Sequence, residues 1–324
     1  MKFEDKFFIY DVPKKFSIKQ FLKSTYHFFK SFLYFFLICF NKTTFVKKDN
    51  IFSIVSIFKN EAPYLKEWIE YHKIVGVDHF YLYNNNSEDG FNAVLEPYVK
   101  QGIVTLLDWT KNQAQMECYH DAIMRFRGES NWLAFIDIDE FIVPNSTSDI
   151  KDFLNNFKNK PSVLAYWKYF GASVKIHRDI NRLVCEDFTV ALNKYADIGK
   201  CFYNTAFDFD ENFKGNNCLH HFFWASWKGI HLPPVNVFGK VVLNNKHKVP
   251  KGTDPLNFPL QINHYFTKSY DEYKVKKTRG DVYYKLNPHD DKYFFYHNGL
   301  ATSTDHHIFK YLVQLKLAMG IKER

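Results

Sequence analysis

Residues 132–140 read Trp-Leu-Ala-Phe-Ile-Asp-Ile-Asp-Glu, and this stretch decides the fold class. Residues 132–136 form a short apolar run of the length expected for a buried strand. The run leads directly into Asp137 and Asp139, and carboxylates in such a place are costly unless they are paired or bound to a metal ion. The stretch therefore predicts a strand that delivers two acidic side chains to one edge of a sheet.

Three strand–helix units precede this strand. Apolar strands over 51–58, 78–83 and 103–108 are each followed by a helix, the later two over 91–100 and 113–126. Such alternation predicts right-handed crossovers and a mostly parallel central sheet flanked by helices, an α/β fold of Rossmann-like type. Ligands of such sheets bind at the carboxyl ends of the strands.

Polar clusters fall at these strand ends. The first is Lys59-Asn60-Glu61, and the second is the loop of residues 84–90, Asn-Asn-Asn-Ser-Glu-Asp-Gly. Both are expected to line a ligand site. Two structural interpretations stay open, because Asn60 suits the N-cap of the next helix and an Asn run suits a turn.

The alternation weakens beyond residue 144. Strands are predicted over 163–170 and 183–192, and residues 193–259 are expected to be irregular. Helices return over 269–279, where Ser269 and Glu272 fit a capping box, and over 307–319. We expect one domain over residues 49–324, with an irregular C-terminal acceptor region.

Residues 1–48 form a separate basic, aromatic segment. The chain has a formal net charge of +8, and residues 13–48 contain eight lysines and no Asp or Glu, so the body is close to neutral and no nucleic-acid partner is expected. The apolar run 32–40 is too short for the roughly 20 residues of a membrane span. We expect residues 14–48 to lie on an anionic membrane surface; docking on the catalytic domain and a signal anchor are the alternatives.

The five cysteines are scattered, and none forms a Cys-x-x-Cys pair. They indicate a reducing compartment, with neither a disulfide framework nor a zinc site, and are expected to be small buried residues.

Asp137 and Asp139 are the strongest candidates for chemistry. In an extended segment, one carboxylate can reach a metal ion while the other meets a sugar hydroxyl. Carboxylate and diphosphate oxygens suit Mg²⁺ or Mn²⁺, which would neutralise the charge on a leaving nucleoside diphosphate. The alternative is that both only cap the next helix.

The sequence resembles glycosyltransferase family 92 and related GT-A enzymes over roughly residues 51–285. The matching motifs are Lys59-Asn60-Glu61, residues 65–72 (LKEWIEYH), 76–80 (GVDHF), 83–87 (YNNNS), 135–141 (FIDIDEF), Trp167 with Phe170-Gly171, and Asn263-His264-Tyr265 with Lys268-Ser269 and Glu272. The resemblance implies a GT-A fold, a nucleotide-sugar donor, a divalent cation and inversion at the anomeric carbon. The best-known donor type of the family is UDP-galactose.

The resemblance also implies roles for single residues. The donor-binding residues would be Lys59, Asn60, Glu61, Asn84, Asn85, Asn86, Asp89 and Asp137. The metal ligands would be Asp137, Asp139 and His264, although a structural His264 stays open. Where the family pattern suggests Glu-Arg-Phe, this chain has Glu186-Asp187-Phe188. Lys200 or Arg182 is a candidate replacement for that arginine.

Inversion requires a carboxylate base for the acceptor hydroxyl. Glu186 and Asp187 are the catalytic candidates, with Glu186 preferred over Glu272 (read as a cap) and Asp281. The expected function is metal-dependent transfer of a hexose, galactose first, from a UDP-sugar to a cell-surface or lipid-linked glycan at the cytoplasmic face of the membrane. The alternatives are a membrane-anchored lumenal enzyme, against which an Asn-Asn-Ser acceptor site at 85–87 counts, and an inactive nucleotide-sugar-binding scaffold.

Overall fold

The computed structural model describes residues 18–39, 46, 48–213, 218–243, 258–278 and 290–322. Asp281 and residues 14–17 of the basic segment lie outside the described residues. The helices are α2 (Ile18–Cys39), α3 (Ala62–Ile74), α4 (Phe91–Lys100), α5 (Gln115–Phe126), α6 (Ile150–Asn155), α7 (Val184–Asp187), α8 (Tyr270–Thr278), α9 (Asp291–Leu300), the 3-10 helix η2 (His307–Tyr311) and α10 (Leu312–Met319).

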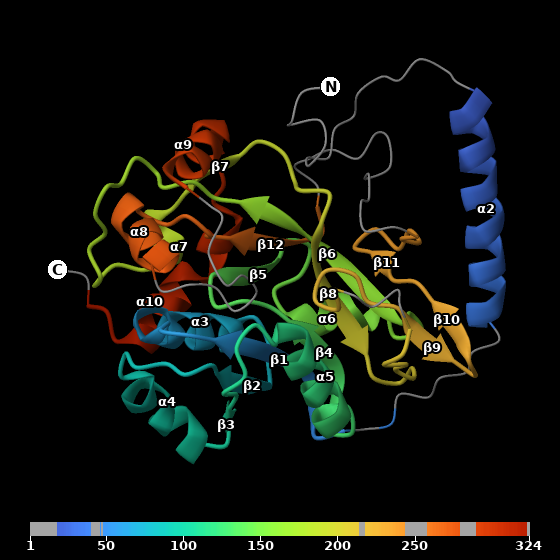
Figure 1. The fold of residues 1–324 in the computed structure, drawn as a ribbon, viewed down its shortest axis with the longest axis horizontal. Coiled ribbons are helices and arrows are strands. Elements are labelled where there is room, and N and C mark those ends of the chain that lie inside the picture. The colour runs from blue at the N-terminus through green and yellow to red at the C-terminus, as the bar shows by residue number, and fades with distance from the viewer. Residues whose placement is uncertain are drawn as a thin grey trace.

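A central sheet of nine strands organises the molecule (Figure 1). Its strands are β1 (Asn50–Phe58), β2 (His79–Asn84), β3 (Val104–Asp108), β4 (Ser130–Phe135), β5 (Glu140–Pro144), β6 (Ser162–Tyr169), β8 (Gly199–Asn204), β11 (Val235–Asn236) and β12 (Leu260–His264). The order is β3-β2-β1-β4-β8-β6-β12-β5, with β11 beside β6. Two short pairs stand apart: β9 (Ala225–Trp227) with β10 (Ile230–Leu232), and β7 (Val190–Leu192) with β13 (Ala301–Thr304).

Strands β3, β2, β1 and β4 are mutually parallel, so their carboxyl ends meet at one edge. Strand β8 runs antiparallel between β4 and β6, and β5 runs antiparallel to β12. The predicted α/β fold, a mostly parallel sheet flanked by helices, is confirmed. The core forms where the apolar strands β1 and β4 meet buried helix residues such as Leu65, Trp68 and Ile69 of α3.

Two predictions for the middle of the chain are wrong. The strand expected over 183–192 is helix α7 followed by the short strand β7. Helix α7 begins there because the Glu67 carboxylate accepts hydrogen bonds from the backbone N–H groups of Val184 (2.8 Å) and Cys185 (3.0 Å). Residues 193–259, which were expected to be irregular, contain strand β8 in the middle of the sheet. The polar residues Lys200 and Asn204 in β8 hide its buried-strand pattern, and both are buried.

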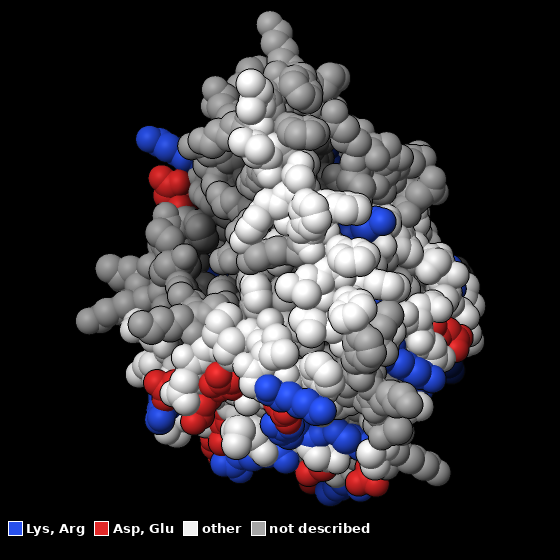
Figure 2. Space-filling model, turned by 90° about the vertical axis from the view of Figure 1, so that its right-hand side faces the viewer, with Lys and Arg blue, Asp and Glu red and all other residues white. Residues whose placement is uncertain are grey.

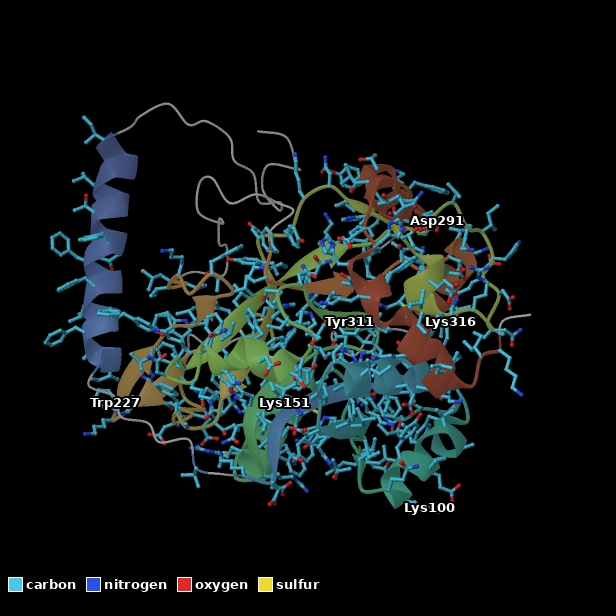
Figure 3. All side chains as sticks on the ribbon, turned by 180° about the vertical axis from the view of Figure 1, so that it is seen from behind. Lys100, Lys151, Trp227, Asp291, Tyr311 and Lys316 are labelled. Atoms are coloured by element: carbon cyan, nitrogen blue, oxygen red, sulfur yellow. The ribbon has the colours of Figure 1, made fainter. Side chains whose placement is uncertain are left out.

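Helix α2 runs along one side of the molecule, at the right of Figure 1. Its C-terminal end lies near Trp227 of β9, which Figure 3 labels, and the Tyr34 hydroxyl donates a 3.1 Å hydrogen bond to the carbonyl oxygen of Pro233. Much of its apolar surface is solvent-exposed: Ile18, Leu22, Tyr26, Phe28, Phe29, Phe32, Leu33, Phe35 and Phe36. Figure 2 looks onto this side, where charged residues gather towards the lower edge. Among the described helices, none is both long enough and apolar enough to cross a bilayer.

Candidate functional site

The two acidic residues lie in a tight turn between β4 and β5. The Glu140 backbone N–H donates to the Asp137 carbonyl oxygen, and the Asp137 N–H donates to the Glu140 carboxylate, both at 3.1 Å. The expectation of an extended segment with carboxylates on opposite sides is therefore wrong, because the chain reverses direction here to form β5. The Asp137 side chain is one-third exposed, whereas Asp139 is buried.

Lys200 of β8 neutralises the first carboxylate. Its Nζ lies 2.8 Å from Asp137 Oδ2 and 3.6 Å from Glu140 Oε2. Burial alone would lower the pKa of Lys200, but the two carboxylates outweigh burial and raise that pKa above its ordinary value. The pKa of Glu140 is raised mainly by burial and further by Asp137 and Asp139, against the effect of Lys200. The ammonium therefore holds a cluster of acidic groups together.

The second carboxylate lies between a lysine and a histidine. Lys276 of α8 donates to Asp139 Oδ2, and His264 Nε2 of β12 lies 3.6 Å from Asp139 Oδ1. Burial would raise the pKa of Asp139, but Lys276, His264 and Lys268 hold it below its ordinary range. Burial lowers the pKa of His264 to about 4, despite the opposing effect of Asp139, so the ring is neutral near pH 7 and can act as a ligand.

The chemistry of this donor set fits a hard divalent cation. Lys200 and Lys276 each contact the Oδ2 atom of one aspartate. Among the described residues, Asp137 Oδ1 has only long contacts, with Gln115 (3.4 Å) and Tyr119 (3.5 Å), and Asp139 Oδ1 faces His264 Nε2. His264 Nδ1 has no hydrogen-bond partner among the described residues. Two carboxylate oxygens and a neutral imidazole suit Mn²⁺ or Mg²⁺. The structure thus places His264 against Asp139, while Asp137 faces Lys200 on the same turn; joint binding of one ion by all three stays a prediction.

The two predicted donor loops are joined to each other. Asn60 Oδ1 accepts from the Glu88 N–H (2.8 Å), and the Asn60 N–H donates to Ser87 Oγ (2.9 Å). Asp89 Oδ2 accepts from the Ala62 N–H (2.7 Å) at the start of α3. The interpretation of Asn60 as the N-cap is wrong, since Glu61 holds that position and Asn60 has φ +53°. We call these contacts the loop clamp.

The asparagine run also contacts a third strand end. The Asn84 side-chain amide donates to Asp108 Oδ1. The Asn85 amide donates to the carbonyl oxygens of Trp109 and Lys111, and the Asn86 amide donates to the carbonyl oxygen of Thr110. The loop after β3 (residues 109–111) is therefore joined to the predicted donor loops, which the sequence did not reveal. Lys59 is half-buried and Glu61 is buried beside this loop clamp.

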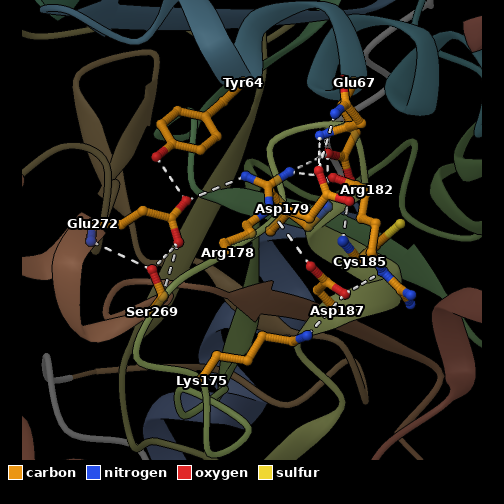
Figure 4. A network of polar contacts seen from close by, with 12 residues as sticks. Tyr64, Glu67, Lys175, Arg178, Asp179, Arg182, Cys185, Asp187, Ser269 and Glu272 are labelled. Atoms are coloured by element: carbon orange, nitrogen blue, oxygen red, sulfur yellow. Dashed lines mark hydrogen bonds and ion pairs between the residues drawn. The ribbon is translucent and has the colours of Figure 1, made fainter.

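Asp187, one of the two predicted catalytic residues, lies in a different polar network, drawn in Figure 4. The buried Asp187 carboxylate lies 2.7 Å from Arg182 Nε, 3.2 Å from Lys175 Nζ and 3.8 Å from Arg178 Nε. Glu186 pairs at 2.7 Å with Lys316 of α10. Arg182 is thus engaged with Asp187, and Lys200 is the replacement candidate that contacts Asp137.

Glu272 in the same network acts as the predicted cap. Its Oε2 accepts from the Ser269 N–H at 3.0 Å, and its Oε1 accepts from the Tyr64 hydroxyl at 2.9 Å and contacts Arg178 Nη1 at 3.2 Å. The capping-box prediction is confirmed.

A family model covers most of the chain. The sequence model of glycosyltransferase family 92 matches residues 48–286, about three-quarters of the chain. The chain belongs to glycosyltransferase family 92.

Curated family 92 relatives share a segment of the chain. A rice family 92 protein (Oryza sativa subsp. japonica) is 32% identical over 118 residues, 36% of this chain and 20% of that protein. The Arabidopsis thaliana galactan beta-1,4-galactosyltransferase GALS2 is 31% identical over 120 residues, 33% of this chain and 23% of that protein. The chain thus matches about a fifth to a quarter of the length of these relatives.

Solved structures give more remote likenesses. Residues 1–349 of Staphylococcus aureus TarS in complex with UDP are 16% identical, with a TM-score of 0.33 over 48% of this chain and 47% of that chain. A mannosyltransferase of Pyrobaculum calidifontis in complex with GDP-Man and Mn²⁺ is 15% identical, with a TM-score of 0.29 over 44% of each chain.

The sequence did not indicate Lys276 or the loop after β3 (residues 109–111), because their contacts are long-range. Lys276 lies in a lysine-rich helix, where nothing local marks one lysine as different from its neighbours. Only the long-range packing of α8 brings it to Asp139, 137 residues away in the sequence.

Proposed function

We propose that the chain is a metal-dependent, inverting glycosyltransferase that moves a hexose from a UDP-sugar to a cell-surface or lipid-linked glycan. One observation carries the proposal: the turn after β4 places Asp137 against Lys200, and Asp139 against His264 and Lys276. Family 92 membership supports the same reaction class.

The metal ion would be held by the two aspartates and His264. When bound, it would offset the negative charge that develops on the leaving nucleoside diphosphate. Lys200, Lys276 and the buried Lys268 add fixed positive charge around the aspartates, which favours binding of a diphosphate. The nucleoside would contact Lys59, Asn60 and Glu61 and the loop that contains Asn84, Asn85, Asn86 and Asp89.

Galactose is the first sugar to test. Three matched relatives are galactan beta-1,4-galactosyltransferases of Arabidopsis thaliana, at 27–31% identity over about a quarter of their length. The acceptor is proposed as a glycan or glycolipid at the cytoplasmic face, because the exposed aromatic surface of α2 suits an interfacial position on an anionic membrane.

Glu186 is the proposed general base. In an inverting reaction, the base accepts the proton of the acceptor hydroxyl while its oxygen attacks the anomeric carbon opposite the leaving group. Glu186 remains partly exposed and pairs with one lysine, whereas Asp187 is buried among three cationic side chains. Asp187 therefore serves in this proposal to hold α7, and with it Glu186, in place.

The test is hydrolysis of a panel of nucleotide sugars, UDP-galactose included, with Mn²⁺ and with chelator. We expect Mn²⁺-dependent release of UDP, lowered at least about 100-fold by Asp139→Asn. The exposed Asp152→Asn serves as the matched control and should leave turnover unchanged. Turnover that survives in Asp139→Asn would exclude the metal assignment. Donor binding without turnover would favour the scaffold alternative.

A further inference from the structure

A second group of side chains of metal-ligating type lies beside the aspartate site. Cys218, His220 and His221 place one ligand atom each within 4.8 Å of one another. One turn of chain gathers them, since the backbone N–H groups of His221 (2.9 Å) and Phe222 (3.0 Å) both donate to the Cys218 carbonyl oxygen. The ligands thus come from a Cys-x-His-His segment that backbone hydrogen bonds already hold in shape.

Each of the two histidines has a ring nitrogen left for a ligand role. His221 Nδ1 lies 2.7 Å from the Gly199 carbonyl oxygen, and because a carbonyl only accepts, Nδ1 carries the proton and Nε2 a lone pair. This orientation by a backbone carbonyl is typical of histidine ligands. His220 is buried, and its Nδ1 has no hydrogen-bond partner among the described residues. An unsatisfied buried nitrogen is costly unless a partner is bound.

We propose that Cys218, His220 and His221 bind a transition-metal ion of the Zn²⁺ class. A thiolate and two imidazoles form a borderline-soft set that prefers Zn²⁺ to the oxygen-seeking Mg²⁺ and Mn²⁺. Three protein ligands leave a fourth position for water or a bound group. Metal binding would release the proton of the Cys218 thiol.

The ion would position a residue of the donor site. The turn is bonded to β8 on both sides of Lys200, through the Gly199 carbonyl to His221 and through the Cys201 N–H to the His220 carbonyl (2.9 Å). The Trp167 ring packs against the rings of both His221 and His264, with centroid separations of 4.7 Å and 4.8 Å. A metal that fixes the turn therefore fixes Lys200 opposite Asp137. The sequence did not indicate this site, because Cys218-Leu219-His220-His221 lacks the Cys-x-x-Cys spacing of common zinc motifs.

Cobalt(II) is the probe that tests this site. The full chain, stripped with a chelator, is titrated with Co²⁺ while the thiolate-to-cobalt charge-transfer band is recorded in the near ultraviolet. We expect one equivalent to give the band, Cys218→Ser to abolish it, and His220→Ala and His221→Ala each to weaken Co²⁺ binding at least about tenfold. Cys118→Ala, at a buried cysteine outside the cluster, serves as the control and should keep the band.

A second measurement does not depend on the variants folding. Zn²⁺ should raise the Tm of the stripped wild-type chain in a concentration-dependent way, because the ion binds the folded state. Asp139→Asn should lose sugar transfer but keep the cobalt band, so failure of the proposed function and failure of this site give different results. Absence of the band in wild type, or its persistence in Cys218→Ser, would overturn the proposal.

Discussion

The Lys200 ammonium lies 2.8 Å from Asp137 Oδ2, although the two residues are 63 positions apart and belong to different strand ends. The lysine is fully buried, and the aspartate is partly open to solvent. The pair therefore links the interior of the sheet to the edge where the ligand site lies. Loss of either partner would be costly, because the Lys200 ammonium is buried and cannot be solvated by water.

Replacement of Lys200 by Met should destabilise the protein and reduce turnover. Loss of one partner from a buried ion pair costs about 3–5 kcal/mol, since Asp137 and Glu140 lose their counter-charge. Urea denaturation measures the free energy of unfolding. Lys274→Met removes an exposed pair with Asp271 and should leave that energy nearly unchanged. An equal decrease in the free energy of unfolding in both variants would show that the buried Lys200 pair is no more stabilising than an exposed pair.

His72 should make the protein sensitive to acid. The buried ring donates from Nδ1 to the Trp68 carbonyl (2.8 Å) and accepts at Nε2 from the Ile142 N–H (3.2 Å), so it must stay neutral. Burial lowers the pKa of His72 to about 3 from an ordinary value of 6.5. Between these values the unfolded chain binds the extra proton, so stability falls as the pH falls.

The matching experiment follows the free energy of unfolding from pH 7 to pH 4. His72→Asn should flatten the pH dependence by about 1.4 kcal/mol per pH unit, the contribution of one proton. The variant will be less stable overall, so the slope and not the absolute value is the criterion. An unchanged slope would contradict the assignment.

Gly199 should tolerate no side chain. A Cβ built there would lie 1.7 Å from the Ala165 carbonyl oxygen of β6, a backbone atom that cannot move without shifting the strand. We expect Gly199→Ala to lower the Tm strongly or to prevent soluble expression. Gly299→Ala in α9 meets nothing within 4 Å and should be neutral or stabilising by up to about 1 kcal/mol. Thermal melts of both variants decide the point.

Glu186→Gln should lower kcat at least about 100-fold while leaving donor binding intact, if Glu186 is the base. Lys316→Met is the control, because it removes the ion pair but keeps the carboxylate. Steady-state kinetics with the donor identified by the panel separate kcat from KM. A kcat that survives in Glu186→Gln would move the search for the base to another carboxylate.

The aromatic surface of α2 should bind anionic membranes. Triple substitution of Phe28, Phe32 and Phe35 by Ser removes exposed rings without touching the docked Tyr34. We expect co-sedimentation with phosphatidylserine vesicles to fall at least about tenfold, and binding to neutral vesicles to be weak throughout. Val313→Ser on α10, an exposed apolar residue elsewhere, should have no effect. Equal binding by all variants would contradict the proposal.

The sequence predicted the parallel half of the sheet because its strands are apolar runs and its helices are amphipathic. It failed for α7 and β8, where tertiary partners decide the outcome: Glu67 caps α7 from another helix, and Lys200 is tolerated inside β8 only because acidic groups face it. Asp137 and Asp139 were predicted as site residues because strand ends mark a ligand site, and His264 was predicted from the family resemblance. Lys276 and the loop after β3 were not, since their contacts arise only on folding.

The loop clamp makes the conformation of each predicted donor loop depend on the other loop. Asn60, Ser87 and Asp89 satisfy backbone or side-chain groups of the opposite loop, so a foreign loop grafted alone would leave those groups unpaired. Residues 59–62 and 84–90, the two loops that we propose to bind the nucleotide, must therefore be transplanted together if the nucleotide preference is to be changed.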